Sequence, residues 1–248
     1  MSWAIELNHL KKQYKNAWVP ALDGLSIRVK EKSITGLLGP NGAGKTTSIN
    51  IICGLLQADE GTVQVFGNPI SNTSSNTGHR IGVVPQQIAL FGNLSAWENY
   101  QYIGTLYGLP NHQVKERATY LLERLGLIKH ADKRVNRFSG GMKRRANIIA
   151  SLLHNPELLI LDEPTAGVDV QSRAMIHAFL HEYHQSGKTI LYTSHYLDEA
   201  EELCEEVIIL DEGKLIAQGS PAALIEATSG ATKLEDVFLS YTGRTVRD

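Results

Sequence analysis

The most constraining feature of the sequence is a glycine-rich loop with the spacing G-x-x-x-x-G-K-S/T. It consists of Gly39, Pro40, Asn41, Gly42, Ala43, Gly44, Lys45 and Thr46. An apolar run, residues 34–38, precedes the loop, and a helix-like run, residues 47–56, follows it. A strand, a glycine loop and a helix in this order are the context in which such a loop binds phosphate. The sequence therefore predicts a nucleoside triphosphate site.

The residue types in this loop match the chemistry of a polyphosphate. Glycines let the backbone curl around an anion, and the N–H groups that open the next helix point toward it. Lys45 would place a positive charge between the β- and γ-phosphates, and the Thr46 hydroxyl can bind Mg²⁺, which prefers oxygen ligands. Thr47 completes the phosphate-binding candidates. A glycine turn that matches by accident is the alternative, and the flanking elements disfavour it.

A second element of triphosphate chemistry follows the apolar run 158–161. Asp162 has the position and charge of a carboxylate that holds Mg²⁺ through water, and Glu163 would polarise an attacking water. Alone, an Asp-Glu pair after a strand is as often part of a solvated loop. Because it follows a complete phosphate loop, we interpret it as the end of a buried strand that carries chemistry.

Composition and charge limit the function classes. The chain has 248 residues, 42% of them hydrophobic and 20% charged, as in an ordinary globular protein. Its net charge of −2 gives no basic footprint, so we expect no nucleic-acid partner. The two cysteines, Cys53 and Cys204, are interpreted as small buried residues in a reducing compartment. Without a membrane-spanning run or a secretory signal, we expect any membrane association to come through another chain.

Alternating strand-like and helix-like segments predict an α/β fold with a mostly parallel sheet and an N-terminal antiparallel β subdomain. The expected strands cover residues 4–7, 25–29, 34–38, 61–67, 80–84, 158–161, 189–193 and 207–210. The expected helices cover residues 47–56, 95–107, 113–125, 170–185 and 196–204, with others from about 141 and after 221. The helical block from about 88 to 155 lies between strands, so we interpret it as a subdomain inserted into a phosphate-loop NTPase core.

A short motif before the 158–161 strand narrows the family, and it consists of Phe138, Ser139, Gly140, Gly141 and Met142. A serine and two glycines leave bare backbone N–H groups at a helix N-terminus, which is a second anion site. With the preceding motifs, it makes the chain resemble the ATP-binding cassette (ABC) ATPases over nearly its whole length. Their signature is L-S-G-G-Q, and the Phe and Met changes here remove no phosphate-facing donor. The following Lys143, Arg144 and Arg145 would either add positive potential or form a solvated basic face.

The resemblance implies roles for further residues. Gln86 matches the glutamine that touches Mg²⁺ and faces the membrane partner, and Asp169 matches the D-loop aspartate that works across a dimer. His195 matches the switch histidine that contacts the γ-phosphate. Tyr14 matches the aromatic residue that stacks on adenine, and Trp18 is the rival for that role.

The resemblance also implies a mechanism. The phosphate loop of one subunit and the signature of another would enclose each ATP, so we expect a dimer with a second copy or with a homologous subunit. The implied catalytic residues are Lys45, Glu163, Asp169 and His195. The implied Mg²⁺ ligands are Thr46, Gln86 and Asp162. The implied nucleotide contacts are Tyr14, the loop 39–47, Gln86, Ser139, Gly140 and Gly141.

The same family features predict a partner and a domain organisation. Residues 1–222 would form the nucleotide-binding domain, and residues 223–248 its C-terminal helical tail. In the family, the surface around Gln86 and residues 88–109 receives a helix of a transmembrane permease. The aromatic residues of this segment would either form that groove or fill the core of the helical subdomain.

The tail 234–244 and the motifs around Ser139 and His195 look like those of ATPase subunits from bacterial drug and antibiotic-resistance exporters. We therefore expect an ATP-hydrolysing export subunit, held on the inner, cytoplasmic face of the membrane by a separately encoded permease. A ribosome-binding or DNA-repair ABC protein is disfavoured because the chain has one cassette, no coiled coil and no basic patch. An importer ATPase is disfavoured by the export-like tail.

Overall fold

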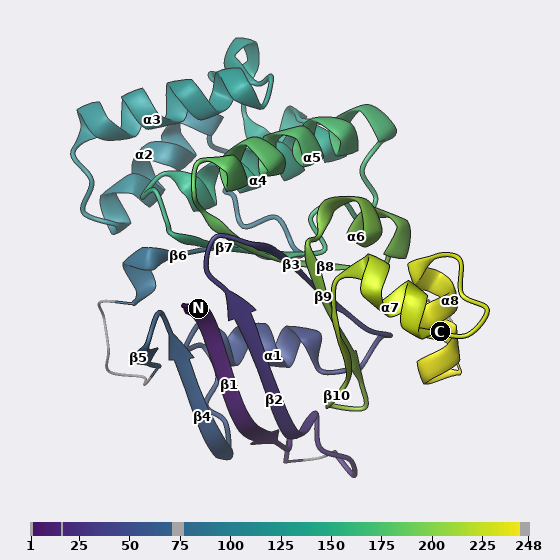
Figure 1. Ribbon diagram of the computed structural model, residues 1–248. Helices are drawn as coiled ribbons and strands as arrows, with labels where there is room; N and C mark the ends of the chain where they lie inside the picture. Colours follow the sequence, from purple (N-terminus) through teal and green to yellow (C-terminus); the bar gives the residue numbers. More distant parts are fainter. Residues whose placement is uncertain (1, 16, 71–76, 244–248) are drawn as a thin grey trace. The chain divides into compact units, whose positions relative to one another are not determined.

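The computed structural model describes residues 2–15, 17–70 and 77–243, which form two compact units. The first unit combines the N-terminal part of the chain up to Gly78 with the C-terminal part from Lys188 onward, and the second comprises His79–Gly187. Figure 1 follows the chain through both units by colour. The chain thus leaves the first unit once and returns to it.

The N-terminal strands of the first unit form an antiparallel sheet in the order β2-β1-β4-β5. These strands are β1 (Trp3–Lys12), β2 (Leu22–Lys30), β4 (Glu60–Val65) and β5 (Asn68–Pro69). Ile5 and Leu7 on β1 are buried while Glu6 between them is partly exposed, the alternation expected of a sheet with one packed face. The prediction of an N-terminal antiparallel β subdomain is confirmed.

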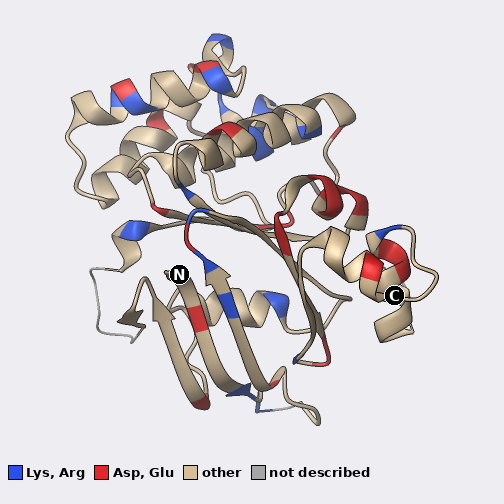
Figure 2. Cartoon of the chain, viewed as in Figure 1, with Lys and Arg blue, Asp and Glu red and all other residues tan. Residues whose placement is uncertain are grey.

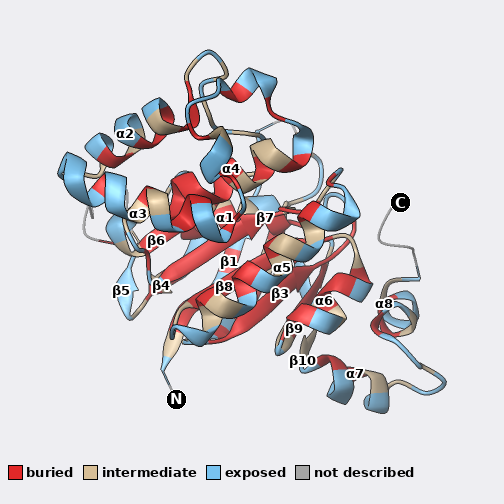
Figure 3. Cartoon of the chain, turned by 90° about the horizontal axis from the view of Figure 1, so that it is seen from above, coloured by how far each residue is buried: buried red, intermediate tan, exposed pale blue. Residues whose placement is uncertain are grey.

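The other strands of the first unit belong to a mostly parallel sheet. They are β3 (Ile34–Leu38), β8 (Thr189–Ser194), β9 (Glu206–Asp211) and β10 (Lys214–Gly219). β3 pairs in parallel with both β8 and β9, and β10 pairs antiparallel with β9. Every residue of β3 and β8 is buried, as Figure 3 shows, because both faces of a parallel sheet are covered.

The helix that follows the phosphate loop differs from its expected bounds. The expected helix covers residues 47–56, whereas α1 covers Lys45–Ile52. It begins earlier because Gly44, at φ 101°, turns the chain directly into the helix. It ends earlier because Gly54 has φ 71° and its N–H bonds back to the Ile51 carbonyl, a typical glycine stop.

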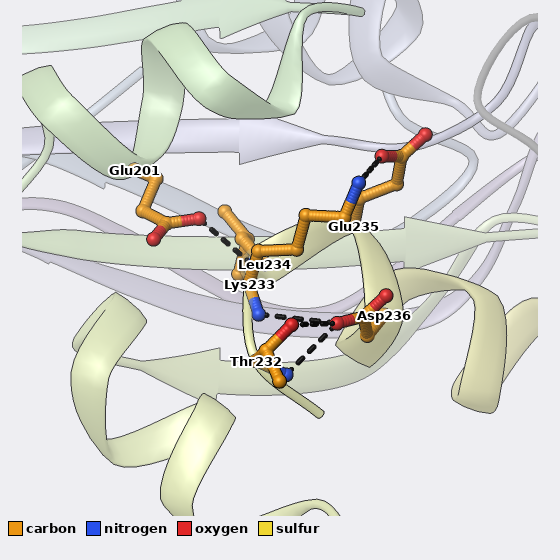
Figure 4. A network of polar contacts seen from close by, with 6 residues as sticks. All are labelled: Glu201, Thr232, Lys233, Leu234, Glu235 and Asp236. Carbon is orange, nitrogen blue, oxygen red and sulfur yellow. Dashed lines mark hydrogen bonds and ion pairs between the residues drawn. The ribbon is translucent and has the colours of Figure 1, made fainter. Parts of the chain in front are cut away.

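The C-terminal helices are docked on the first unit. They are α7 (Pro221–Ala227) and α8 (Leu234–Thr242), and α8 contacts both α7 and α6 (Leu197–Leu203). Glu201 of α6 accepts a hydrogen bond from the Leu234 backbone N–H at 2.8 Å (Figure 4). Asp236 accepts from Thr232 in the same network (Figure 4), and Phe238 is completely buried. Residues 244–248 of the expected tail lie outside the described residues.

The second unit combines two parallel strands, β6 (Ile81–Val84) and β7 (Leu158–Asp162), with four helices. The helices are α2 (Ala96–Leu106), α3 (Asn111–Arg124), α4 (Gly140–Leu152) and α5 (Val170–Gln185). Short 3₁₀ turns cover Gly78–Arg80, Ile128–His130 and Val135–Arg137. Ser95 and Glu98 form the reciprocal hydrogen bonds of a capping box at the start of α2. The α/β class with an inserted helical subdomain is thereby confirmed.

Within residues 2–15, 17–70 and 77–243, no helix is both long and apolar enough to pass through a bilayer. Figure 2 shows that charged residues are spread over both units, with acidic ones gathered on α6 and at the start of α8.

Candidate nucleotide site

The phosphate loop of the first unit joins buried β3 to α1. Gly42 and Gly44 have φ values of 82° and 101°, which other residues adopt only with strain. Gly39 is required for a different reason, because a Cβ there would lie 2.5 Å from the Leu210 carbonyl oxygen. No side chain caps α1, and its first turn holds no acidic residue. The N-terminus of α1 therefore suits an anion.

Lys45 is already seated in the loop that it is expected to serve. Its side chain is buried, and its Nζ donates hydrogen bonds to the carbonyl oxygens of Gly39 at 2.7 Å and Pro40 at 3.0 Å. A phosphate oxygen would replace these carbonyls as a stronger, charged acceptor. The lysine side chain therefore already lies at the loop where the phosphates are expected.

The two rival aromatic residues differ in their contacts. The Tyr14 hydroxyl lies 3.3 Å from the Thr47 hydroxyl on α1 and is therefore tied to the phosphate-loop helix. Trp18 is 99% exposed, whereas Tyr14 is 45% exposed. This contact with α1 favours Tyr14 as the residue that stacks on adenine.

His195 lies at the same sheet edge as the phosphate loop. Leu38 of β3 pairs with Ser194 of β8 in a parallel register, so Gly39 and His195 leave neighbouring strands at their carboxyl ends. That edge is the usual binding edge of α/β sheets. The His195 ring packs against Tyr196 with centroids 4.2 Å apart, and the Tyr196 N–H donates to the Ser194 hydroxyl at 2.9 Å. The first unit therefore brings the switch-histidine candidate toward the phosphate loop.

The second unit brings Gln86 and Glu163 together in the same manner. Val84 of β6 pairs with Leu161 of β7, so the segments after both strands leave one edge of the sheet. The Gln86 Nε2 donates a hydrogen bond to the Glu163 Oε2 at 3.0 Å, and the neighbouring Asp162 is buried. Glu163 has φ 48°, a left-handed conformation that costs about 1–3 kcal/mol for a residue with a side chain. Such strain is typical of positions where a side chain must point in one direction.

The signature motif opens α4, where Ser139 is the capping residue. Its hydroxyl accepts a hydrogen bond from the Met142 N–H at 3.2 Å. Gly140 is exposed, and a Cβ there would meet nothing within 4 Å. Gly141 is buried, and a Cβ there would lie 2.3 Å from the Ser172 hydroxyl and 2.7 Å from the Asp169 Oδ2. The sequence pattern treats the two glycines alike, but only Gly141 is required by packing.

Asp169 caps α5 within the same cluster. Its Oδ1 accepts from the Ser172 N–H at 2.9 Å, and the hydrogen bonds from Ser172 lower the pKa of the Asp169 carboxyl below its usual value. Arg145 adds a smaller effect in the same direction. The D-loop and signature candidates of one chain are therefore in direct contact. Sequence reasoning missed Ser172, although an acidic cap three residues before a serine is a recognisable pattern.

Among the residues outside 1, 16, 71–76 and 244–248, no group of three or more His, Cys, Asp or Glu is placed to hold a metal ion. The oxygen donors that the sequence predicts are the Thr46 hydroxyl in the first unit and the Asp162 carboxylate and Gln86 amide in the second. Donors of these kinds suit Mg²⁺, which is usually bound by one or two carboxylates, water and the phosphates of its substrate.

Comparison with known proteins places these features in a family. Residues 22–166 match the ABC transporter family. The linearmycin resistance ATP-binding protein LnrL of Bacillus subtilis is 42% identical over 231 residues, which are 93% of this chain and 74% of the relative. The Nod factor export ATP-binding protein I of Ralstonia nicotianae is 41% identical, over 93% of this chain and 71% of the relative.

Solved structures agree with this assignment. CbiO1 of Clostridium perfringens, part of the ABC transporter complex CbiONQ, has a TM-score of 0.81 and 29% identity, over 92% of each chain. A dimeric ATP-binding cassette in a post-hydrolysis state bound to ADP and Pi has a TM-score of 0.79 and 27% identity, over 87% of this chain and 98% of the other. The chain therefore belongs to the ABC transporter family, and it is an ATP-binding, ATP-hydrolysing domain of that family.

Proposed function

We propose that the chain is the ATPase subunit of a bacterial exporter, in which ATP-driven dimerisation is coupled to substrate movement through a separate transmembrane permease. The observation that carries the proposal is its likeness, over nearly the whole chain, to ATP-binding proteins named for linearmycin resistance and Nod factor export. A drug or antibiotic is the substrate class that the first of these names supports.

The dimer follows from the number of half-sites. Each chain carries one phosphate loop and one signature helix, on α1 and α4. Two chains in opposite orientation would enclose two ATP molecules, each between the phosphate loop of one chain and Ser139 and Gly140 of the other. A related cassette is itself a dimer bound to ADP and Pi, which supports this arrangement.

The residues divide the hydrolysis reaction between them. Glu163 accepts a proton as water attacks the γ-phosphorus, and the bond from that phosphorus to the β–γ bridging oxygen breaks to give ADP and phosphate. Lys45 and the N-terminus of α1 stabilise the negative charge on the phosphates, and His195 contacts the γ-phosphate. Tyr14 stacks on adenine, and Asp169 acts across the dimer.

Mg²⁺ fits the oxygen donors of this chain. Thr46 and Gln86 would bind it directly, and Asp162 through water, because their oxygen atoms are the donors that this cation prefers. Because the Gln86 Nε2 donates to Glu163, the Gln86 Oε1 would be the atom that holds the cation. Bound Mg²⁺ would neutralise charge on the β- and γ-phosphates.

The aromatic residues between 88 and 109 separate into core and surface. Tyr100 is fully buried, whereas Phe91 and Tyr102 are about half exposed and meet edge to face with centroids 5.2 Å apart. Leu106, which lies on α2 with Tyr102, is 68% exposed. We assign this exposed apolar surface to permease docking, which would hold the chain on the inner face of the cell membrane.

Co-purification with a permease tests the proposal. The chain carrying Glu163→Gln is co-expressed with a permease of six membrane spans that is encoded by a neighbouring gene. Membranes are then extracted with and without Mg-ATP. We expect the two proteins to purify together and the ATPase subunit to be dimeric with Mg-ATP. In reconstituted wild type, ATPase stimulation by linearmycin is the first probe of the substrate class. A subunit that stays monomeric with Mg-ATP and permease would contradict the proposal.

A further inference from the structure

Arg144 is not part of a solvated basic face. It lies on the signature helix α4 and is only 7% exposed. Its Nη1 donates a hydrogen bond at 3.1 Å to the carbonyl oxygen of Pro85, the residue directly before Gln86. Burial lowers the pKa of the Arg144 guanidinium, while the carboxylates of Glu163 and Asp162 favour its charged form. A buried arginine stays protonated, so a full positive charge sits beside this segment.

Asn147 makes a second contact from the same face of α4, one turn further along. Its Oδ1 accepts a hydrogen bond from the Ala89 N–H at 3.0 Å, and its side chain is 3% exposed. Its Nδ2 is buried without a hydrogen-bond partner in the described parts of the chain. A buried donor without a partner costs about 1–3 kcal/mol. Asn147 therefore makes its contact with Ala89 although its own Nδ2 carries that cost.

The two contacts enclose the segment 85–89, which contains Gln86. Arg144 holds the carbonyl at its start, and Asn147 holds the N–H at its end. Between them, Gln86 donates to Glu163. The helix that makes both contacts begins directly after the signature serine, Ser139, so it joins the signature motif to the segment that contains Gln86.

We propose that Arg144 and Asn147 are positioning residues that clamp the segment 85–89 to the signature helix and thereby hold Gln86 against Glu163. The proposal rests on the roles proposed above for Gln86 and Glu163. It assigns a function to a basic residue that would otherwise contribute only positive potential. It also gives the signature helix a direct mechanical link to the catalytic glutamate within one chain.

A double-mutant cycle separates positioning from general stabilisation. The full chain carrying Arg144→Gln, Gln86→Ala or both is assayed for steady-state ATPase activity with Mg-ATP, giving kcat and KM for each. We expect Arg144→Gln alone to lower kcat about 10- to 100-fold with little change in KM, the usual effect of misplacing a reacting group by a small distance. In the Gln86→Ala background, we expect Arg144→Gln to cause no further fall, because its target is already gone.

Three further variants complete the cycle. Arg144→Lys keeps the charge and a donor, so we expect it to restore part of the lost kcat. Asn147→Ala provides the same cycle if Arg144→Gln does not fold. Arg117→Gln is the matched control, because Arg117 bonds Asn155 at 2.7 Å near the other end of α4, and we expect it to retain wild-type kcat.

The outcomes are distinct. If Gln86→Ala lowers kcat and Arg144→Gln adds its full effect on top, the role of Gln86 stands and the clamp is wrong. If Gln86→Ala leaves kcat unchanged, the proposed role of Gln86 fails, and the clamp fails with it. An unchanged kcat in folded Arg144→Gln also overturns the proposal.

Discussion

The two helices that open the half-sites, α1 and α4, begin in opposite ways. Gly44 leads into α1 in a left-handed conformation with no side-chain cap. Ser139 leads into α4 in an extended conformation, and its hydroxyl caps the Met142 N–H. Both are N-termini of the kind that bind anions, but only the first keeps its opening turn clear of side-chain acceptors.

The difference teaches how one chain can contain a permanent site and a conditional one. The first turn of α1 offers backbone N–H groups, Lys45 and the hydroxyls of Thr46 and Thr47, and no side chain caps it, so it suits tight binding of phosphate within the chain. At the N-terminus of α4, the Ser139 hydroxyl already accepts from the Met142 N–H without nucleotide. In the proposed dimer, the same hydroxyl would still have a proton to donate to ATP held by the second chain. At a third helix N-terminus, that of α5, the capping group is the Asp169 carboxylate, whose negative charge repels phosphate.

The largest expected effect concerns turnover, which tests whether nucleotide bound at the phosphate loop is hydrolysed with the help of Glu163. Glu163→Gln keeps the shape of the side chain but removes the base, so turnover should fall about 10²–10⁴-fold while Mg-ATP still binds. Steady-state ATPase assays and nucleotide titration measure the two quantities separately. Glu116→Gln on the exposed face of α3 serves as the control. Unchanged turnover in Glu163→Gln would remove this residue from catalysis.

The next effect concerns binding at α1. Lys45→Ala removes a charged donor from the phosphate loop, and we expect the Kd for Mg-ATP to rise about 10- to 100-fold. Calorimetric titration measures it, with Lys30→Ala on β2 as a matched change at an exposed lysine. Wild-type affinity in Lys45→Ala would contradict the phosphate-loop interpretation.

The two signature glycines sharpen the description of α4. Gly141→Ala introduces a methyl group against Ser172 and Asp169, so we expect the free energy of unfolding to fall by about 1–3 kcal/mol. Gly140→Ala meets open space and should change it by less than about 0.5 kcal/mol. Denaturant unfolding of the two variants side by side is the measurement. Equal stabilities would mean that the close contact between signature and D-loop does not form.

The smallest expected loss of stability caused by removing a contact distinguishes the cap from the phosphate contact at Ser139. Ser139→Ala removes the N-cap and should cost about 1 kcal/mol of stability. Ser139→Asp keeps a good cap but adds a negative charge, so we expect near wild-type stability with lost cooperative ATPase activity. Thermal unfolding and ATPase assays on both variants test this. Wild-type ATPase activity in Ser139→Asp would show that phosphate does not approach this helix.

The sequence predictions were most accurate where the signal lies in neighbouring residues. The expected helix at residues 170–185 agrees with the bounds of α5, because its cap and its apolar spacing are both written in neighbouring residues. The expected helix at residues 95–107 contains α2 for the same reason, because a capping box of neighbouring residues opens it. β10 was not predicted, because its residues are all exposed or half-exposed and show no alternation.

Contacts between distant residues could not be predicted. Arg144 and Pro85 are 59 positions apart, and only the packing of α4 on β6 brings them together. The packing requirement for glycine at position 141 could not be predicted either, because Ser172 approaches it from another helix. The motifs therefore identified which residues belong to the candidate site, while the fold decided which of them touch.

The docked helix α8 has a practical consequence for handling the protein. Leu234, Val237 and Phe238 have no exposed surface, so a chain shortened before residue 234 would uncover the apolar strip that they occupy. Such a fragment is expected to expose an apolar patch and to self-associate or aggregate. Glu201 would at the same time lose the backbone donor that it holds. Trimming the polypeptide for crystallisation, or fusing a reporter, is therefore safer beyond α8 than before it.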